Sequence, residues 1–387
     1  MMHRTKRAYR SIAGIGLVAA ASLVLSGCSV TGAGTSSGDT EGDGTGTINA
    51  LFMKQAGYSE SDVAGMIKDF ESKNPKITVK PTFVAYEALH DKIVTSAPAG
   101  TYDVVHLDVI WPADFASKGI ITDVTERFPE SWKSEMLGGA LTSAEYQGKF
   151  YGVPWGPSTK MFFFNKEMVA KVGASQSDLT TWDGVLTVAR KIMDAGLVKY
   201  PLAWSWSQAE ALVCDYAQLL GAFGGEFTDS SGKLVTNEGA GVEALAWMKK
   251  TIDDGLTDPA SLTFLEDDAN KSMAAGKTAM EINWESTFRD QNDPSISKVV
   301  GQVVVTPTPA GPNGDHPGVN GSMALAIGAK SKHQLAAWKF IEYMTSQSVQ
   351  EQYVKSSMTN WKSSYTKPEV TESNPRSSRP PESPTTR

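Results

Sequence analysis

The sequence predicts an α/β protein of two domains, and two observations support that prediction. Apolar runs of strand length alternate with segments of helical periodicity, which is the pattern of a parallel sheet with helices on its faces. About 310 residues lie between a leader-like beginning and an unusual tail, a length typical of two domains. In the first half, the alternation predicts strands at 48–53, 77–84 and 102–107 and helices at 59–73, 86–96 and 113–118.

The helix that begins near Ser59 shows how such an element is recognised. Its apolar residues recur at helical spacing, namely Val63, Met66, Ile67 and Phe70. Asn74 and Pro75 end it, because a residue that precedes proline disfavours helical backbone.

The stretch 151–168 is either a hinge that carries a binding surface or an ordinary loop–strand–helix connection. Its first part holds Gly152, Pro154, Gly156 and Pro157, which are incompatible with a helix or a central strand. The run 161–164 then has strand length and composition, and Asn165 occupies the position of a helix N-cap. Beyond it, the same patterns predict helices at 182–195, 208–220, 242–252, 265–275 and 334–345, and strands at 201–206, 278–283, 299–305 and 323–327.

The first 28 residues have the three parts of an export signal. Four basic residues precede an apolar run at 12–25 that is too short to span a membrane, and Leu-Ser-Gly-Cys follows. This ending resembles a bacterial lipobox, in which the cysteine is diacylated; a plain signal peptide with an incidental cysteine is the alternative. We expect a lipoprotein signal peptide at 1–27, lipidation at Cys28 and a flexible tether at 28–47.

The charge balance argues against nucleic acid and acidic lipid as partners. The chain has a formal net charge of −7. Removal of the signal takes away four positive charges and moves it to −11. Only Cys214 remains after Cys28, so we expect no intramolecular disulfide.

Sequence motifs of catalytic and cofactor sites are missing. None of the five histidines has metal-ligand spacing, and there is no phosphate-binding glycine loop, zinc-protease helix or nucleophile elbow. We therefore expect no metal and no cofactor. Asp108 and Glu285 follow different predicted strands, and a glycoside hydrolase needs two carboxylates in one cleft. An exported carbohydrate-active enzyme is therefore the alternative function.

Aromatic residues gather where predicted strands end. Five tryptophans do so: Trp111, Trp155, Trp204, Trp206 and Trp284. A flat aromatic ring stacks on the C–H face of a sugar, while carboxylates and amides bind neighbouring hydroxyls. Because ligands of such sheets bind beyond the strand ends, we expect a sugar site there; for any single tryptophan, packing in the core is the alternative. The polar residues expected in this site are Lys54, Gln55, Asp108, Glu285 and Asn320.

Short motifs spread over 48–370 resemble those of a known family. They lie at 107–108 with 111–119, 151–154 with 164–166, 181–183, 224–225 with 229 and 232–233, 275–280 and 336–341. In this order they resemble the extracellular solute-binding proteins of ABC sugar importers, of the maltose/trehalose type. The resemblance implies a two-lobed periplasmic-binding-protein-like fold with a hinge and an interlobe ligand cleft. The chain should cross between the lobes near 156–160, 305–308 and 345.

The resemblance also implies domain bounds. It assigns 48–157 plus 307–345 to an N-terminal lobe and 158–306 plus 346–373 to a C-terminal lobe. Residues 374–387 have no apolar periodicity, and we interpret them as a disordered tail. Members of the family usually continue through further helices at this point. We hypothesise a frameshift or premature end, which reading the other frames downstream of Asn374 tests.

We therefore predict a binding protein without enzymatic activity. It captures a neutral mono- or disaccharide between its lobes and delivers it to ABC permease subunits. We expect a monomer, held by lipid at Cys28 on the extracytoplasmic face of the cell membrane. Polyol, amino-acid, peptide and metal ligands are alternatives within this class, although the sequence lacks the His or Tyr cluster that an iron site needs.

Overall fold

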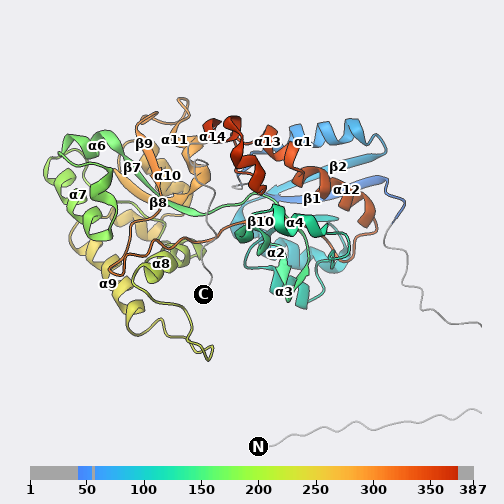
Figure 1. Ribbon diagram of the computed structural model, residues 1–387, viewed down its shortest axis with the longest axis horizontal. Coiled ribbons are helices and arrows are strands. Elements are labelled where there is room, and N and C mark those ends of the chain that lie inside the picture. Colours follow the sequence, from blue (N-terminus) through green and yellow to red (C-terminus); the bar gives the residue numbers. More distant parts are fainter. Residues whose placement is uncertain (1–41, 55–56, 374–387) are drawn as a thin grey trace, which may run out of the picture. The chain divides into compact units, whose positions relative to one another are not determined.

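The computed structural model describes residues 42–54 and 57–373. A first sheet has five strands in the order β2-β1-β3-β10-β6 (Figure 1). Their bounds are β1 Gly46–Met53, β2 Ile77–Val84, β3 Val104–Asp108, β6 Val153–Pro154 and β10 Met323–Ile327. β1 pairs in parallel with β2 and β3, as the alternation of strands and helices predicted. β10 returns from far along the chain and runs antiparallel to β3 and β6.

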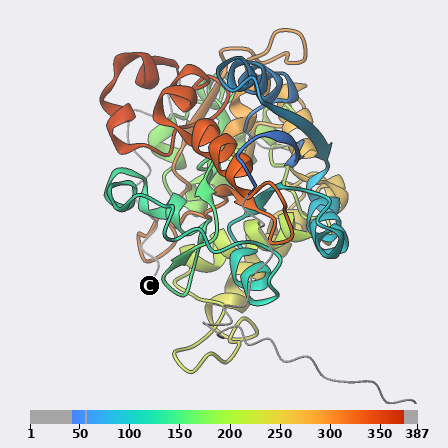
Figure 2. The same cartoon turned by 90° about the vertical axis from the view of Figure 1, so that its right-hand side faces the viewer.

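Helix α1 (Glu60–Lys73) forms as its sequence predicts. The Ser59 hydroxyl accepts from the Asp62 amide at 3.1 Å, and the Asp62 carboxylate accepts from the Ser59 amide at 2.9 Å, which makes a capping box. On its buried face, the Phe70 ring lies 5.1 Å from the ring of Phe340 in α12 (Gln334–Thr345). Figures 1 and 2 both show α12 beside β1, so these helices cover one face of the first sheet.

Shorter elements complete this part of the fold. They are α2 Tyr86–Ser96, η1 Ala97–Ala99, α3 Pro112–Ser117, α4 Glu130–Glu135, α5 Gly138–Leu141 and the strand pair β4 Glu145–Tyr146 and β5 Lys149–Phe150.

A second sheet has three strands in the order β8-β7-β9, all antiparallel. Its strands are β7 Lys160–Asn165, β8 Met280–Trp284 and β9 Val303–Thr306. β8 and β9 flank β7 and both run antiparallel to it, so they run in the same direction as each other. The helices of this part are α6 Lys166–Lys171, η2 Gln176–Leu179, α7 Trp182–Asp194, α8 Glu210–Ala222, α9 Ala240–Asp253, η3 Pro259–Thr263, α10 Glu266–Ala274, η4 Glu285–Thr287 and α11 Phe288–Gln291.

The strand expected at 201–206 does not form. Only Leu202 makes isolated bridges, to Thr257 and Met280. The backbone amide of Trp204 donates to the hydroxyl of Ser261 in η3 at 3.1 Å, so a side chain accepts the hydrogen bond that a neighbouring strand would otherwise accept.

The chain passes between the two sheets at two places. The first passage lies between Pro154 at the end of β6 and Lys160 at the start of β7, where the sequence predicted it. The second lies about twelve residues later than expected. Residues 307–318 still pack on the second sheet's helices, since Ala310 bridges Thr181 and the Gln218 amide donates to the Pro317 carbonyl at 2.9 Å. The passage therefore follows Pro317, and 307–318 does not join the first lobe as expected.

The segment after Thr345 also differs from the expected domain bounds. It forms α13 Gln347–Gln352, η5 Lys362–Thr366 and α14 Pro368–Ser373. Val349 and Trp361 belong to the core around the first sheet, and the Trp361 indole donates to the Thr345 carbonyl at 3.0 Å. Residues 346–370 therefore pack on the first lobe, because their apolar side chains cover its helix α5. No third passage near 345 occurs in the part of the chain that the structure describes.

The predicted signal peptide at 1–27, the lipid site at Cys28, residues 28–41 of the tether and the tail at 374–387 lie outside the described residues. Within 42–54 and 57–373, no helix combines the length and the apolar character that crossing a membrane requires.

A buried carboxyl lies in the second sheet. Glu281 of β8 is fully buried, and its Oε1 accepts from the Gln291 amide at 2.6 Å. Burial raises the pKa of Glu281 to about 8. The folded protein therefore keeps a proton on this group at neutral pH, whereas an unfolded chain releases it near its ordinary pKa of about 4.3.

Trp361→Ala should lower the free energy of unfolding by about 3–5 kcal/mol, because it removes a buried indole from the first lobe's core. Urea unfolding measures the change, with the exposed Lys355→Ala as the matched control. A loss below about 1 kcal/mol would mean that 346–370 contributes little to the first lobe.

Glu281→Gln should remove a pH dependence of stability. Between about pH 4.5 and about pH 8 the unfolded wild-type chain binds fewer protons than the folded one, so its free energy of unfolding falls as pH rises. The amide does not titrate, so the variant should gain on the order of a few kcal/mol over wild type from about pH 5 to about pH 8. Urea titrations at several pH values measure both proteins. If the free energies of unfolding of wild type and variant change with pH by the same amount, the pKa of Glu281 is not raised.

Candidate functional site

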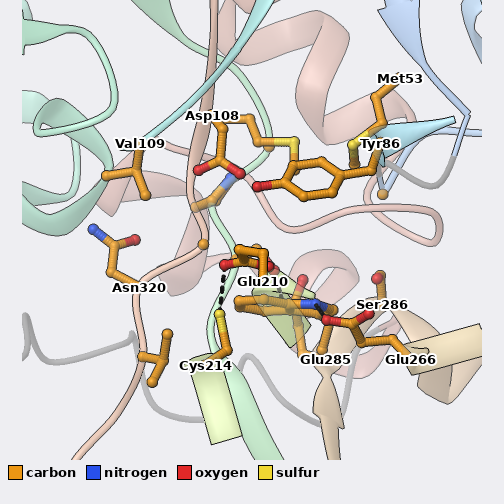
Figure 3. A pocket seen from close by; sticks show the side chains of 18 of the residues that line it. Met53, Tyr86, Asp108, Val109, Glu210, Cys214, Glu266, Glu285, Ser286 and Asn320 are labelled. Carbon is orange, nitrogen blue, oxygen red and sulfur yellow. Dashed lines mark hydrogen bonds between the residues drawn. The ribbon is translucent and has the colours of Figure 1, made fainter. Parts of the chain in front are cut away.

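One cavity of about 320 Å³ is lined by residues from both sheets (Figure 3). From the first sheet, Met53 ends β1 and Asp108 ends β3. From the second, Trp284 ends β8. Both chain passages line it as well, with 155–158 and 319–321. The cavity therefore lies beyond strand ends, where ligands of α/β sheets bind.

Trp284 forms part of the second sheet's wall. Its indole N–H donates to Glu266 Oε1 at 3.3 Å, and its ring centroid lies 5.1 Å from Lys160 Nζ. Gly321 approaches the ring so closely that a Cβ there would lie 2.4 Å from Cζ3. Three neighbours thus fix the indole before any ligand binds.

Lys160 is the buried cation behind this wall. Its Nζ lies 2.7 Å from the Asp215 carboxylate, and neither side chain is exposed; Glu266 Oε1 is 3.6 Å away. Burial alone would lower the pKa of Lys160, but the charges of Asp215 and Glu266 raise it above its ordinary value. The ammonium therefore stays charged.

Asp108 and Tyr86 form the opposite wall. Figure 3 shows the Tyr86 hydroxyl beside the Asp108 carboxylate, to which it is hydrogen-bonded. Ile110 N lies 3.4 Å from Asp108 Oδ1. Burial raises the pKa of Asp108, and it raises that of Tyr86 as well.

Glu210 and Cys214 lie one turn apart on α8. The thiol donates to Glu210 Oε1 at 2.6 Å. Burial raises the pKa of the Cys214 thiol far above its ordinary range, so it is protonated and a weak nucleophile. Burial also raises the pKa of Glu210.

Glu285 and Asn320 join the pocket to the chain passages. Glu285 Oε2 accepts from the Ser158 hydroxyl at 2.7 Å and from the Thr159 amide at 3.1 Å. The Asn320 amide donates to the Gly139 carbonyl at 2.9 Å. Both polar groups therefore already hold protein partners.

Trp155 lines the cavity but is only 1% exposed. Its ring stacks on Tyr58 with centroids 4.7 Å apart, and His106 meets it edge-on at 5.0 Å. The Trp155 ring therefore packs against its neighbours and has little exposed surface on which a ligand could stack.

The other expected residues lie elsewhere. Trp204 and Trp206 stack on each other, 5.6 Å apart, inside the second sheet's core, because 201–206 runs beneath its helices. Trp111 packs behind Tyr86 and does not line the cavity. Lys54 is exposed, 3.8 Å from Glu60, and Gln55 lies outside the described residues. The structure thus brings together Asp108, Trp155, Trp284, Glu285 and Asn320.

Sequence reasoning missed several lining residues: Met53, Tyr86, Glu210, Cys214 and Glu266. Met53 and Tyr86 adjoin predicted strand ends, so the rule that ligands bind beyond strand ends could have identified them. Glu210 and Glu266 begin helices, where acids are common for local reasons, so nothing marked them as ligand residues.

Lys160→Met should lower the free energy of unfolding by about 3–5 kcal/mol, because Asp215 is left as an unpaired buried charge. Adding Asp215→Leu should recover most of the loss, since the fully buried unpaired charge is then removed and Glu266 is partly exposed. Urea unfolding of both variants measures this, and exposed Lys166→Met is the matched control. A single variant as stable as the control would rule out this ion pair as a structural constraint.

Comparison with known proteins places this chain in a family of binding proteins. The family model described as bacterial extracellular solute-binding protein matches residues 43–351. A putative binding protein of Brucella abortus is 26% identical over 278 residues, which is 72% of this chain and 66% of that protein. The chain thus matches slightly less than two thirds of that relative's length.

Two solved structures share the fold. Maltose-bound T. maritima MalE3 is 28% identical with a TM-score of 0.78 and covers 86% of both chains. A solute-binding protein of Thermotoga lettingae bound with alpha-D-tagatose is 26% identical with a TM-score of 0.76 and covers 84% of both. The predicted two-lobed fold is confirmed.

Proposed function

This chain belongs to the bacterial extracellular solute-binding protein family, and we propose that it captures a carbohydrate between its lobes for an ABC importer. The observation that carries the proposal is Trp284, an aromatic ring at the cavity wall with the carboxylate of Glu266 on its edge. An aromatic face and an adjacent acceptor are the two groups that a sugar ring requires. The similar proteins that hold maltose and tagatose support the same ligand class.

The cavity volume supports a small ligand. About 320 Å³ lies at the lower end of the range of small-molecule sites, ~300–1,000 Å³. This favours the mono- or disaccharide expected from the sequence over a long oligosaccharide.

The two chain passages form the hinge in this proposal. Thr159 and Asn320 bridge in antiparallel pairing, so the passages lie side by side. Lobes of 48–155 plus 320–370 and of 160–318 fit the packing, and rotation about the paired passages closes the cavity over a ligand. A permease then distinguishes the closed form from the open one.

Family membership implies an extracytoplasmic location. We further propose that lipid on Cys28 anchors the chain to the cell membrane and that it acts as a monomer. The export signal and lipobox of the sequence support the first point.

The exported carbohydrate-active enzyme is the competing function. Relatives in the family are binding proteins. Glu285, one of its two candidate carboxylates, already accepts two hydrogen bonds from the chain passage, which disfavours a role as acid or nucleophile. A labelled sugar recovered unaltered after incubation supports binding; a cleaved one supports the enzyme.

Trp284→Ala should abolish measurable carbohydrate binding, because it removes the stacking face. Asp108→Ala should do the same from the opposite wall. Calorimetry against a panel of sugars measures both, with Trp206→Phe as the matched control in the core of the same lobe. If Trp284→Ala and Asp108→Ala bind the sugar as tightly as the wild type and the control do, this pocket is not the ligand site.

A further inference from the structure

The described residues that line the pocket carry acids and no bases. No lysine, arginine or histidine is among them, whereas six acids are: Glu87, Asp108, Glu210, Glu266, Asp267 and Glu285. Glu87 and Asp267 are exposed at the rim, and Glu285 is satisfied by the chain passage. The remaining three carboxyls, those of Asp108, Glu210 and Glu266, are therefore the ones that would interact most directly with a charged ligand.

These three carboxyls act on one another. Burial raises the pKa of Glu210, and the charges of Asp108 and Glu266 raise it further. Figure 3 shows Asp108 on one side of the cavity and Glu210 and Glu266 on the other. Lys160 is paired with Asp215 at 2.7 Å and lies behind Trp284. It offsets the charge of Glu266 only in part, at 3.6 Å.

Two of these carboxyls lie at helix N-termini. Glu210 is the first residue of the 13-residue helix α8, and Glu266 is the first of the nine-residue helix α10. The positive end of each helix dipole stabilises an anion there. The fold thus places carboxyl groups at the cavity from two helices of the second lobe and from β3 of the first.

A neutral sugar complements this charge poorly. When the cavity closes, the carboxyls lose water, and hydroxyls return hydrogen bonds but no charge. A protonated amine supplies both hydrogen bonds and a compensating positive charge. A metal ion is not the better fit, because no group of three or more ligating side chains in the described residues is arranged to hold one.

We propose that the ligand is an amino sugar whose protonated amine lies among Asp108, Glu210 and Glu266, in place of the neutral sugar expected from the sequence. This proposal rests on the carbohydrate-binding function proposed above. The ring of the ligand stacks on Trp284, and its amine occupies the space between the two lobes' carboxyls.

Calorimetric titration of the full chain with matched pairs tests the proposal. The pairs are D-glucosamine with D-glucose, D-galactosamine with D-galactose, and the β-1,4 disaccharide of glucosamine with cellobiose; the N-acetylated forms serve as uncharged controls. We expect at least one amine to bind about tenfold or more tightly than its neutral partner at pH 7. We expect added salt to weaken that preference, because charge pairing is screened.

Substitution of single carboxyls tests whether they cause the preference for the amino sugar over its neutral partner. Glu210→Gln and Glu266→Gln should each reduce the amine-to-neutral affinity ratio several-fold, whereas Glu243→Gln, an exposed acid on α9, should leave it unchanged. Thermal unfolding confirms that each variant is folded. Equal or tighter binding of the neutral partners overturns the amine proposal but leaves carbohydrate binding standing. If no member of any pair binds, both proposals fail.

Discussion

A buried ammonium constrains the wall of the pocket that comes from the second sheet. Lys160 and Asp215 are paired at 2.7 Å with no exposed surface, and an unpaired charge there would cost several kcal/mol. The start of β7 and helix α8 therefore cannot separate without breaking this pair. Trp284 and Glu266 lie against the same ammonium, so the stacking surface and its acceptor are held in place before a ligand arrives.

The same arrangement decides the charge of the pocket. Because Asp215 takes most of the positive charge of Lys160, the carboxyls on the cavity side remain largely uncompensated. The first lobe adds Asp108 at the end of β3, where Tyr86 bonds it. Rigid strand ends and helix starts supply these groups, and the flexible part of the site is reduced to the two paired chain passages. Preorganised walls and a bending joint are the physical requirements of a two-lobed receptor.

Local pattern predicted most of the strands and the strand-end position of Asp108 and Trp284, because periodicity and proline placement report on nearby backbone. The first passage, near 156–160, was instead implied by the resemblance to a known family. It could not separate Trp284 from Trp204: both adjoin predicted strands, and only the three-dimensional packing puts one at the cavity and the other in the core. The apolar residues at 346–370 suit either lobe, so their packing on the first lobe was not readable. Glu210 looked like an ordinary first-turn acid, since its role depends on its distance from residues remote in sequence.

Hydrogen–deuterium exchange with and without a bound carbohydrate tests the central claim, that one ligand engages both lobes at this pocket. Strand ends on both sheets line the cavity, as do the passages at 155–158 and 319–321. The account predicts that ligand slows exchange at 108–110 in the first lobe, at 284–287 in the second and in both passages. Protection confined to one lobe, or absent from the passages, would contradict it.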